Sequence, residues 1–225
     1  MPEIIRDQVI RNKYHSGFSR NVPVTEIVLH STMGGGTYRY MVNGERGTYY
    51  KKGEALFHYL IEESGRIIEI IDPDRWVYHS SSSGHDRFSI GIEFEKNDRT
   101  NLKEPNAAQY AAIDYLLRYL LKRFPRVLTI TGHDYNAAKY SGRPPKPCPG
   151  GLNWERIIMP LGFKKQSPMF FTRSISDVVS TGEKAIGGGL LLGIGIGGYL
   201  LWRYYRGKNN SEYYSNSDLP PARIQ

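Results

Sequence analysis

Residues 22–36 read VPVTEIVLHSTMGGG, and this stretch decides how the chain begins its fold. The run from Val22 to His30 is rich in valine and isoleucine, which favours a buried strand. The glycine-rich loop over residues 31–36 ends that strand sharply. His30 therefore lies at a strand end, where a histidine taken alone is most often a hydrogen-bonded structural residue.

Further strands are expected downstream of this loop. Residues 57–62 and 66–71 are strand-like runs separated by a short turn, which predicts a hairpin. Residues 89–95 alternate large apolar with small or acidic side chains, as a half-buried strand does. That alternation puts Glu93 and Glu95 on the face opposite the apolar side chains.

Helical patterns alternate with these strands. Apolar residues recur at helical spacing from Pro105 to about Arg123, and Pro125 ends the helix. Residues 127–131 predict another buried strand, with His133 just after its end, and residues 152–159 suggest a short closing helix. The expected fold class is α/β, with a mixed central β-sheet flanked by helices.

Composition divides the chain into five parts and limits its partners. The formal net charge of +8 favours an anionic partner, such as nucleic acid, anionic lipid or the acidic bacterial wall. No nucleic-acid recognition motif accompanies the charge, so we expect no nucleic-acid partner.

The first six residues lack the apolar run of a secretory signal. The predicted parts are an N-terminal arm (1–22), a folded domain (23–160), a linker (161–184), a transmembrane helix (185–202) and a polar tail (203–225).

The uncharged stretch 185–202 is expected to be a single-pass membrane helix. As a helix it would be about 27 Å long, close to a hydrocarbon core of about 30 Å. Aromatic and basic residues at its end resemble an interfacial anchor for contact with membrane lipid. A flexible glycine-rich linker or a buried hairpin is the alternative interpretation. Three glycines at every fourth position form a stripe suited to helix self-association: Gly189, Gly193 and Gly197.

A second set of residues indicates a metal site. Two histidines at strand ends, His30 and His133, are joined by the only cysteine, Cys148, inside the proline-stiffened loop KPCPG at residues 146–150. Two imidazoles and one thiolate make a three-ligand zinc site that leaves a fourth position for water, as catalytic sites do. Taken alone, each residue has a plainer interpretation, Cys148 as a small buried hydrophobe among them.

Five motifs in order resemble the type 2 N-acetylmuramoyl-L-alanine amidases, a superfamily that includes phage lysozymes, cell-wall recycling amidases and peptidoglycan-recognition proteins. The resemblance covers roughly residues 20–160. It implies a mixed sheet with helices on its faces and a zinc ion at one end of a peptidoglycan groove. The motifs are IVLHST (27–32), FHYLI (57–61), SIGIE (89–93), TGH (131–133) and KPCPG (146–150).

The resemblance also implies roles for particular residues. His30, His133 and Cys148 match the ligands of Zn²⁺. Glu93 matches the general base, and Lys146 matches the lysine that stabilises the developing oxyanion. Taken alone, Glu93 is as readily an exposed strand carboxylate, with Glu95 equally available, and Lys146 a solvated surface lysine. Two further histidines are candidate substrate contacts, although structural roles are more usual for them: His58 and His79.

Two departures from the family pattern concern activity. Phe57 stands where the phage lysozymes carry a tyrosine, which favours a mechanism based on Glu93. The loop between His133 and Cys148 is longer than the family's usual one.

The sequence therefore predicts a zinc amidase that cuts between N-acetylmuramic acid and L-alanine, as a phage lytic enzyme anchored in a virion membrane or the host cell envelope. The alternatives are a catalytically inactive peptidoglycan-binding membrane protein and a membrane structural or fusion protein.

Overall fold

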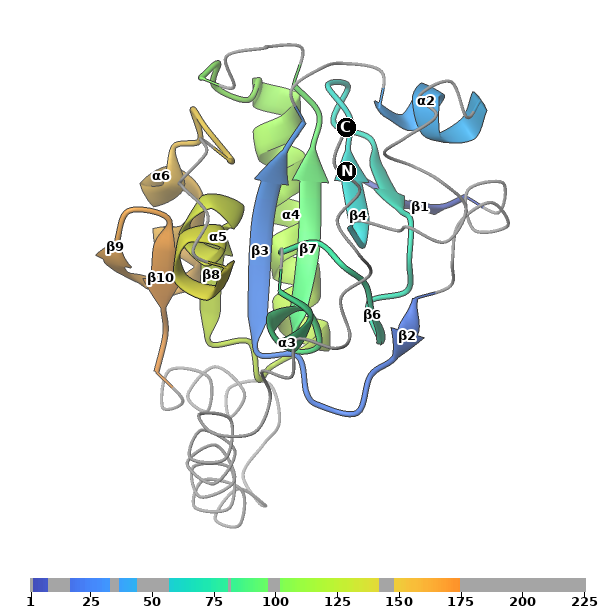
Figure 1. The fold of residues 1–225 in the computed structure, drawn as a ribbon. Helices are drawn as coiled ribbons and strands as arrows, with labels where there is room; N and C mark the ends of the chain where they lie inside the picture. Colours follow the sequence, from blue (N-terminus) through green and yellow to red (C-terminus); the bar gives the residue numbers. More distant parts are fainter. Residues whose placement is uncertain are drawn as a thin grey trace, which may run out of the picture. The chain divides into compact units, whose positions relative to one another are not determined.

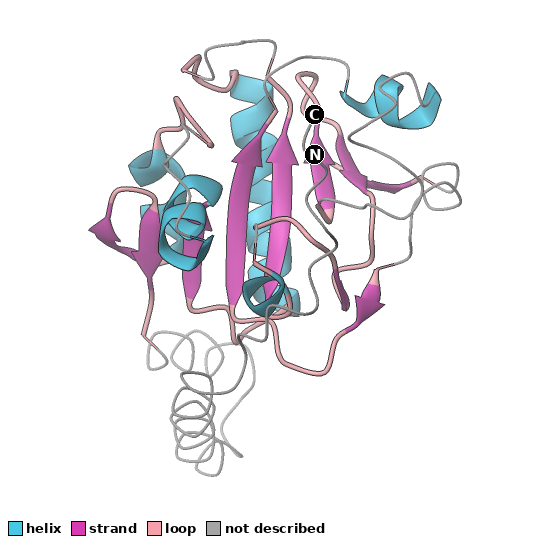
Figure 2. Ribbon diagram, in the orientation of Figure 1, coloured by secondary structure: helices cyan, strands magenta, loops and turns pink. Residues whose placement is uncertain are grey.

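The computed structural model describes residues 2–7, 17–32, 37–43, 57–80, 82–96, 102–141 and 148–174. These residues form a central β-sheet with helices on both of its faces (Figures 1 and 2). The predicted α/β class is therefore confirmed.

Within the described residues, eight strands form one mixed sheet in the order β1-β5-β4-β7-β3-β8-β10-β9. A separate short ladder pairs β2 with β6 in antiparallel fashion. The strands are β1 Ile4–Arg6, β2 Phe18–Ser19, β3 Glu26–Ser31, β4 Tyr59–Ile61, β5 Ile67–Glu69, β6 Arg75–Trp76, β7 Ser89–Phe94, β8 Thr129–Gly132, β9 Lys164–Ser167 and β10 Phe170–Thr172.

The middle of the sheet is parallel and buried on both faces. Strands β4, β7, β3 and β8 are paired in parallel, and β3 is buried along its whole length. Strand β7 is also buried at every position except Glu93, so the expectation of a half-buried strand was wrong. The small residues on its second face do not meet solvent: Gly91, for example, lies directly against the ring of His79. Parallel strands covered on both faces in this way are typical of α/β folds.

Helix α4, Ala107–Arg123, confirms the long predicted helix and covers one face of the sheet (Figure 1). It begins two residues after Pro105, because Asn106 provides the N-cap. The Asn106 side chain accepts the backbone N–H of Gln109, and the Gln109 side chain accepts that of Asn106, which satisfies two helix-terminal donors. The buried stripe of the helix joins the main core: Ile113, Leu116, Leu117 and Leu120.

Helices α3 and α5 lie in front of the sheet in Figure 1, opposite α4. Helix α5 was not predicted, since it begins directly after β8 with no turn residues between them. Its first turn is supported by the backbone N–H of Asp134, which donates to the carbonyl oxygen of Cys148 at 2.8 Å. The helices are α2 Thr37–Asn43, α3 Ser83–Asp86, α5 His133–Ser141, α6 Trp154–Ile158 and the 3₁₀ turn η1 Met159–Leu161.

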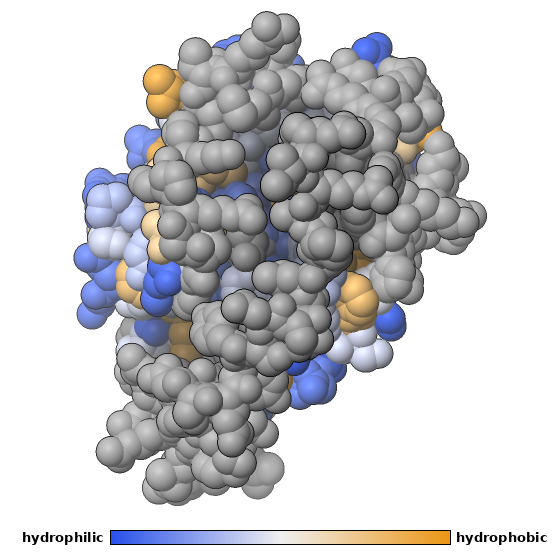
Figure 3. All heavy atoms as spheres, viewed as in Figure 1, coloured by the Kyte–Doolittle hydropathy of each residue, from blue (hydrophilic) through white to orange (hydrophobic). Residues whose placement is uncertain are grey.

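The segment predicted as a linker from residue 161 begins with a hairpin of the sheet. Strand β10 pairs antiparallel with both β8 and β9. Phe171 is fully buried and stacks on Trp154 with ring centroids 5.6 Å apart. The edge strand β9 carries exposed Lys164 and Lys165, and this edge is hydrophilic at the left of Figure 3. Exposed lysines are usual on an edge strand, but they also made its sequence resemble a linker.

The N-terminal arm is likewise part of the fold where the structure describes it. Strand β1 pairs in parallel with β5, and β2 pairs with β6. The Arg75 guanidinium donates to the carbonyl oxygen of Gly17 at 2.8 Å and holds the segment in place. Strands of two and three residues are too short to show a period in sequence.

The predicted membrane helix and polar tail lie in residues 175–225, outside the described residues. Among the helices that are described, none has the length and apolar character needed to cross a bilayer.

Candidate metal centre and active site

The candidate ligands converge at the carboxyl ends of parallel strands. His30 lies near the end of β3, and His133 follows β8 as the first residue of α5. Such strand ends are where open α/β sheets usually bind ligands. Glu93 lies on the next strand, β7, where it is the register partner of His30.

Three donor atoms form a cluster. One ligand atom each of His30, His133 and Cys148 lies within 4.8 Å of the others, the one such cluster found among the described residues. The two imidazole rings are 4.7 Å apart between centroids. Donors around one tetrahedral zinc lie about 3–4 Å apart, given zinc–ligand bonds of about 2.0–2.3 Å. The donor types therefore fit zinc, and the three atoms lie close enough together to converge on one ion.

Backbone contacts hold Cys148 beside the histidines. Its carbonyl oxygen accepts the Asp134 N–H at the start of α5, and its Sγ lies 3.9 Å from the carbonyl oxygen of Ser31. Pro149 packs so tightly on Gly132 that a Cβ atom there would come within 3.1 Å of the proline ring. The loop that carries Cys148 is thus fastened to the residues that precede and follow His133.

The protein alone does not favour a thiolate at Cys148. Burial, and then the negative charge of Glu93, raise the pKa of this thiol to about 12. Burial also holds the pKa of His30 well below its usual value, so this imidazole is neutral at pH 7. A bound dication reverses the preference at the thiol, because it stabilises the thiolate.

Glu93 is the carboxylate of this site that has the properties of a general base. Burial raises its pKa to about 8, yet its side chain is only partly covered. A group that binds a proton near neutral pH can both accept and release one during a reaction. Glu95, the alternative from sequence, is buried and its carboxylate accepts the backbone N–H of Thr37, so it has a structural role. Lys146 lies outside the described residues.

His58 and His79 are interior residues, with 0% and 7% of their surface exposed. In His58, Nδ1 accepts the Gly91 N–H and Nε2 lies 3.0 Å from the Arg75 carbonyl oxygen. Burial and then the charge of Arg20 lower its pKa to about 3. The geometry gives no support to the expected substrate contacts. His79 instead contacts His30, which the sequence did not indicate.

A second buried group, also missed from sequence, supports α5. The Glu26 carboxylate on β3 pairs with His85 at 3.0 Å and accepts from Asn136 of α5 at 3.2 Å. Burial would raise the pKa of Glu26, but these partners and Thr131 lower it overall, so it is ionised. Glu26 therefore ties the helix that begins with His133 to the strand that carries His30.

Sequence comparison assigns the family. The profile of the N-acetylmuramoyl-L-alanine amidase domain matches residues 20–151, more than half of the chain. This chain belongs to the N-acetylmuramoyl-L-alanine amidase family. A search of curated proteins gave no match.

Solved structures share the fold of this amidase at low sequence identity. The endolysin LysCS from Clostridium intestinale URNW has a TM-score of 0.56 at 20% identity, over 72% of this chain and 96% of that chain. The Ph2119 endolysin of a Thermus scotoductus MAT2119 bacteriophage gives 0.52 at 19% identity, over 70% and 97%. Drosophila peptidoglycan recognition protein SD gives 0.51 at 20% identity, over 78% and 98%.

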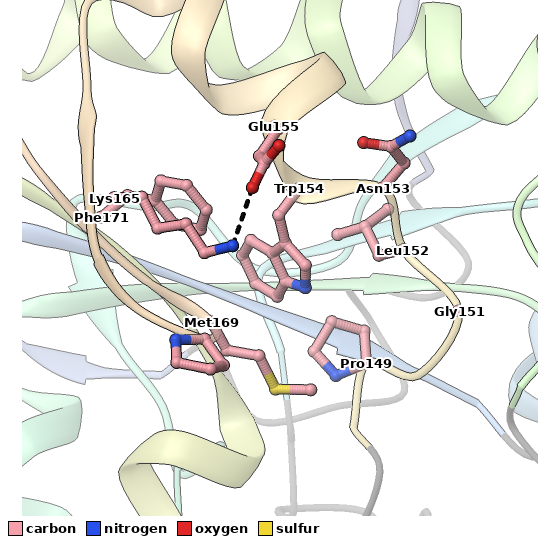
Figure 4. A pocket seen from close by; sticks show the side chains of 10 residues that line it. Pro149, Gly151, Leu152, Asn153, Trp154, Glu155, Lys165, Met169 and Phe171 are labelled. Atoms are coloured by element: carbon pink, nitrogen blue, oxygen red, sulfur yellow. Dashed lines mark hydrogen bonds and ion pairs between the residues drawn. The ribbon is translucent and has the colours of Figure 1, made fainter.

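A pocket of about 310 Å³ lies between the segment after Cys148 and the β9–β10 hairpin (Figure 4). Pro149, which follows Cys148, forms one wall, and the ring of Trp154 lines another. Lys165 and Glu155 form an ion pair at its rim, with Nζ and Oε1 2.7 Å apart. Most of the lining residues come after residue 151 and so lie beyond the segment that matches the family profile.

Proposed function

We propose that this protein is a zinc-dependent hydrolase that cleaves the amide bond between N-acetylmuramic acid and L-alanine in peptidoglycan. The convergence of His30, His133 and Cys148 beside Glu93, within an amidase-family domain, is the observation that supports it. The donor set is catalytic in type, since three protein ligands leave one position for water or substrate.

The protein's own residues have distinct roles in this proposal. His30 and His133 would offer ring nitrogens to the ion, and Cys148 would give up its proton on binding it. A zinc ion held there supplies Lewis acidity, which polarises the scissile carbonyl and lowers the pKa of water. Glu93 takes a proton from the attacking water on its carboxylate and passes it to the departing nitrogen of L-alanine. On the family resemblance, Lys146 holds the developing negative charge on oxygen.

The pocket lined by Pro149 and Trp154 is the proposed place for part of the substrate. It offers an aromatic surface at Trp154 and charged groups at Glu155 and Lys165, which suits a ligand with both apolar and polar groups. Pro149, which lines the pocket, directly follows the candidate ligand Cys148 in the chain.

The second candidate function is peptidoglycan binding without cleavage. A peptidoglycan recognition protein shares the fold, which keeps this alternative open. The position of Cys148 within the donor cluster favours the hydrolase.

We also propose that residues 185–202 hold the enzyme at a membrane, in a phage virion or in the host cell envelope, where it serves as a lytic enzyme. The uncharged sequence supports lipid contact, and the glycines at 189, 193 and 197 support helix self-association. Fractionation after gentle lysis tests the anchor: we expect the full-length chain in the membrane fraction, and recovery in the soluble fraction contradicts it.

Product analysis tests the reaction. The full-length protein in mild detergent is incubated with purified peptidoglycan, and the new chain ends are identified by mass spectrometry. We expect free amino termini of L-alanine, and none from the Cys148→Ser variant. New reducing sugar ends instead would contradict amide hydrolysis. Retention on peptidoglycan without new ends would favour the binding protein.

A further inference from the structure

The imidazole of His30 is hydrogen-bonded to a second buried histidine. Its Nε2 lies 3.2 Å from Nδ1 of His79, and the two rings meet edge to face with centroids 5.3 Å apart. Between two neutral imidazoles, one nitrogen must carry the proton and the other must accept it. The position of this proton therefore decides which nitrogen of His30 remains available to bind a metal ion.

The far end of this hydrogen-bond chain fixes its direction. The hydroxyl of Ser89 donates to the backbone carbonyl oxygen of His85 at 3.0 Å, and a carbonyl can only accept. The Ser89 oxygen must then accept from Nε2–H of His79, which lies 3.0 Å away. Nδ1 of His79 is left with a lone pair, so it accepts from Nε2–H of His30.

A carboxylate favours the same arrangement. Oδ1 of Asp86 accepts the backbone N–H groups of His79 and Ser80 and lies 3.6 Å from Nε2 of His79. A negative oxygen at that place favours a proton on Nε2 of His79 over a lone pair.

Packing leaves His79 little freedom to turn away. A Cβ atom on Gly91 would come within 2.7 Å of Cγ and 2.9 Å of Nδ1 of His79, so the ring lies directly against the backbone of β7. His58 packs edge-on at 5.7 Å between centroids. Glycine at residue 91 of the SIGIE motif thus makes the space that the second histidine occupies.

We propose that His79 and Ser89 are positioning residues that hold His30 in the tautomer protonated on Nε2, which leaves Nδ1 as the nitrogen for the metal ion. Outer hydrogen bonds of this kind set the orientation and basicity of metal-bound histidines. The part that concerns the metal rests on the proposed zinc function. The tautomer belongs to the metal-free protein and is tested without it.

Nuclear magnetic resonance of the zinc-free, full-length protein is the first test. Long-range proton–nitrogen correlations distinguish a histidine protonated on Nδ1 from one protonated on Nε2, and the His30→Gln variant identifies the His30 signals. We expect both His30 and His79 to be protonated on Nε2. A proton on Nδ1 of His30 would overturn the proposal.

Zinc affinity, measured by competition with a coloured chelator, is the second test. We expect His79→Leu to weaken zinc binding about 10–100-fold, the usual cost of losing an outer partner. His79→Gln restores most of it, since its amide can accept from His30 and donate to Ser89. His58→Leu is the comparison variant, with a smaller expected loss, because His58 is also buried and packs on His79 but makes its own contacts with Gly91 and Arg75.

The outcomes distinguish the positioning role of His79 from the proposed zinc function. Equal losses in His58→Leu and His79→Leu, or no loss in either, would overturn the positioning role. If the wild type binds no zinc while His30 shows the expected tautomer, the proposed function fails and the hydrogen-bond chain stands. Ser89→Ala provides a milder variant if His79→Leu does not fold, and we expect it to increase the population of the other His30 tautomer.

Discussion

His30 and Glu93 are register partners on the neighbouring parallel strands β3 and β7. Partner residues project from the same face of a sheet, so the candidate metal ligand and the candidate base lie together. A slip of one residue would turn one of them toward α4, on the opposite face. The pairing of these two buried strands therefore places the candidate metal ligand next to the candidate base.

The Glu93→Gln variant tests the proposed base. Glutamine keeps the shape of the side chain but cannot accept the proton, so we expect kcat to fall about 10²–10⁴-fold. Zinc content, measured by atomic absorption, should stay close to that of the wild type. Glu95→Gln is the matched control and should retain activity, since the amide oxygen can still accept from Thr37. Full activity in Glu93→Gln would rule out the assigned role.

The same substitution should stabilise the zinc-free protein at high pH. The unfolded chain loses the Glu93 proton near pH 4.5, whereas burial keeps the proton bound up to about pH 8 in the folded chain. Stability is therefore lost as pH rises through this window, by up to about 5 kcal/mol at about 1.4 kcal/mol per pKa unit. Urea unfolding at pH 6 and pH 9 measures this. The free energy of unfolding of Glu93→Gln should exceed that of the wild type by more at pH 9 than at pH 6. An equal difference at both pH values would contradict the raised pKa of Glu93.

Substitution of Trp154 tests the pocket as a substrate site. Trp154→Ala removes the aromatic surface of the pocket and none of the proposed proton-transfer groups, so KM should rise and kcat should change little. An aromatic contact of about 0.5–1.5 kcal/mol corresponds to a rise of about 2–10-fold. Trp154→Phe keeps a ring against Phe171 and should show a smaller effect. A fall in kcat at unchanged KM would show that the pocket does not bind substrate.

Two truncations test the C-terminal boundary of the domain. A chain ending at residue 160 lacks Phe163 and Phe171, which are 2% and 0% exposed, whereas one ending at residue 174 keeps both. Loss of one buried phenylalanine costs about 3–5 kcal/mol. We expect the longer chain to unfold cooperatively on heating and the shorter one to be poorly folded. Equal unfolding temperatures would show that β9 and β10 are dispensable.

The sequence predicted those parts of the fold that have strong local patterns. The strand ending at His30 and the helix after Pro105 are long enough to show their periods. The β9–β10 hairpin was missed because its lysines face solvent on an edge strand. Helix α5 was missed because its start depends on the Cys148 carbonyl oxygen, fourteen residues along the chain from Asp134.

The sequence indicated the three residues of the candidate donor cluster, but not the residues that hold them in place. His30, His133 and Cys148 carry motifs, and the structure brings them together. The contact of His79 with His30 depends on the packing of a loop over β7, and the only local signal for it is the glycine at residue 91. The sequence did not indicate the contacts of Glu26, because a single carboxylate in an apolar strand does not reveal which partners it will meet.

The most direct test of the central claim is a zinc titration. The full-length protein is first stripped with a chelator, and the rate at which L-alanine amino termini appear in peptidoglycan is then measured as zinc is added back. We expect no activity without zinc, and a rate that rises with added metal and levels off at one ion per chain. Undiminished activity in the stripped protein, or zinc binding that restores none, would contradict it.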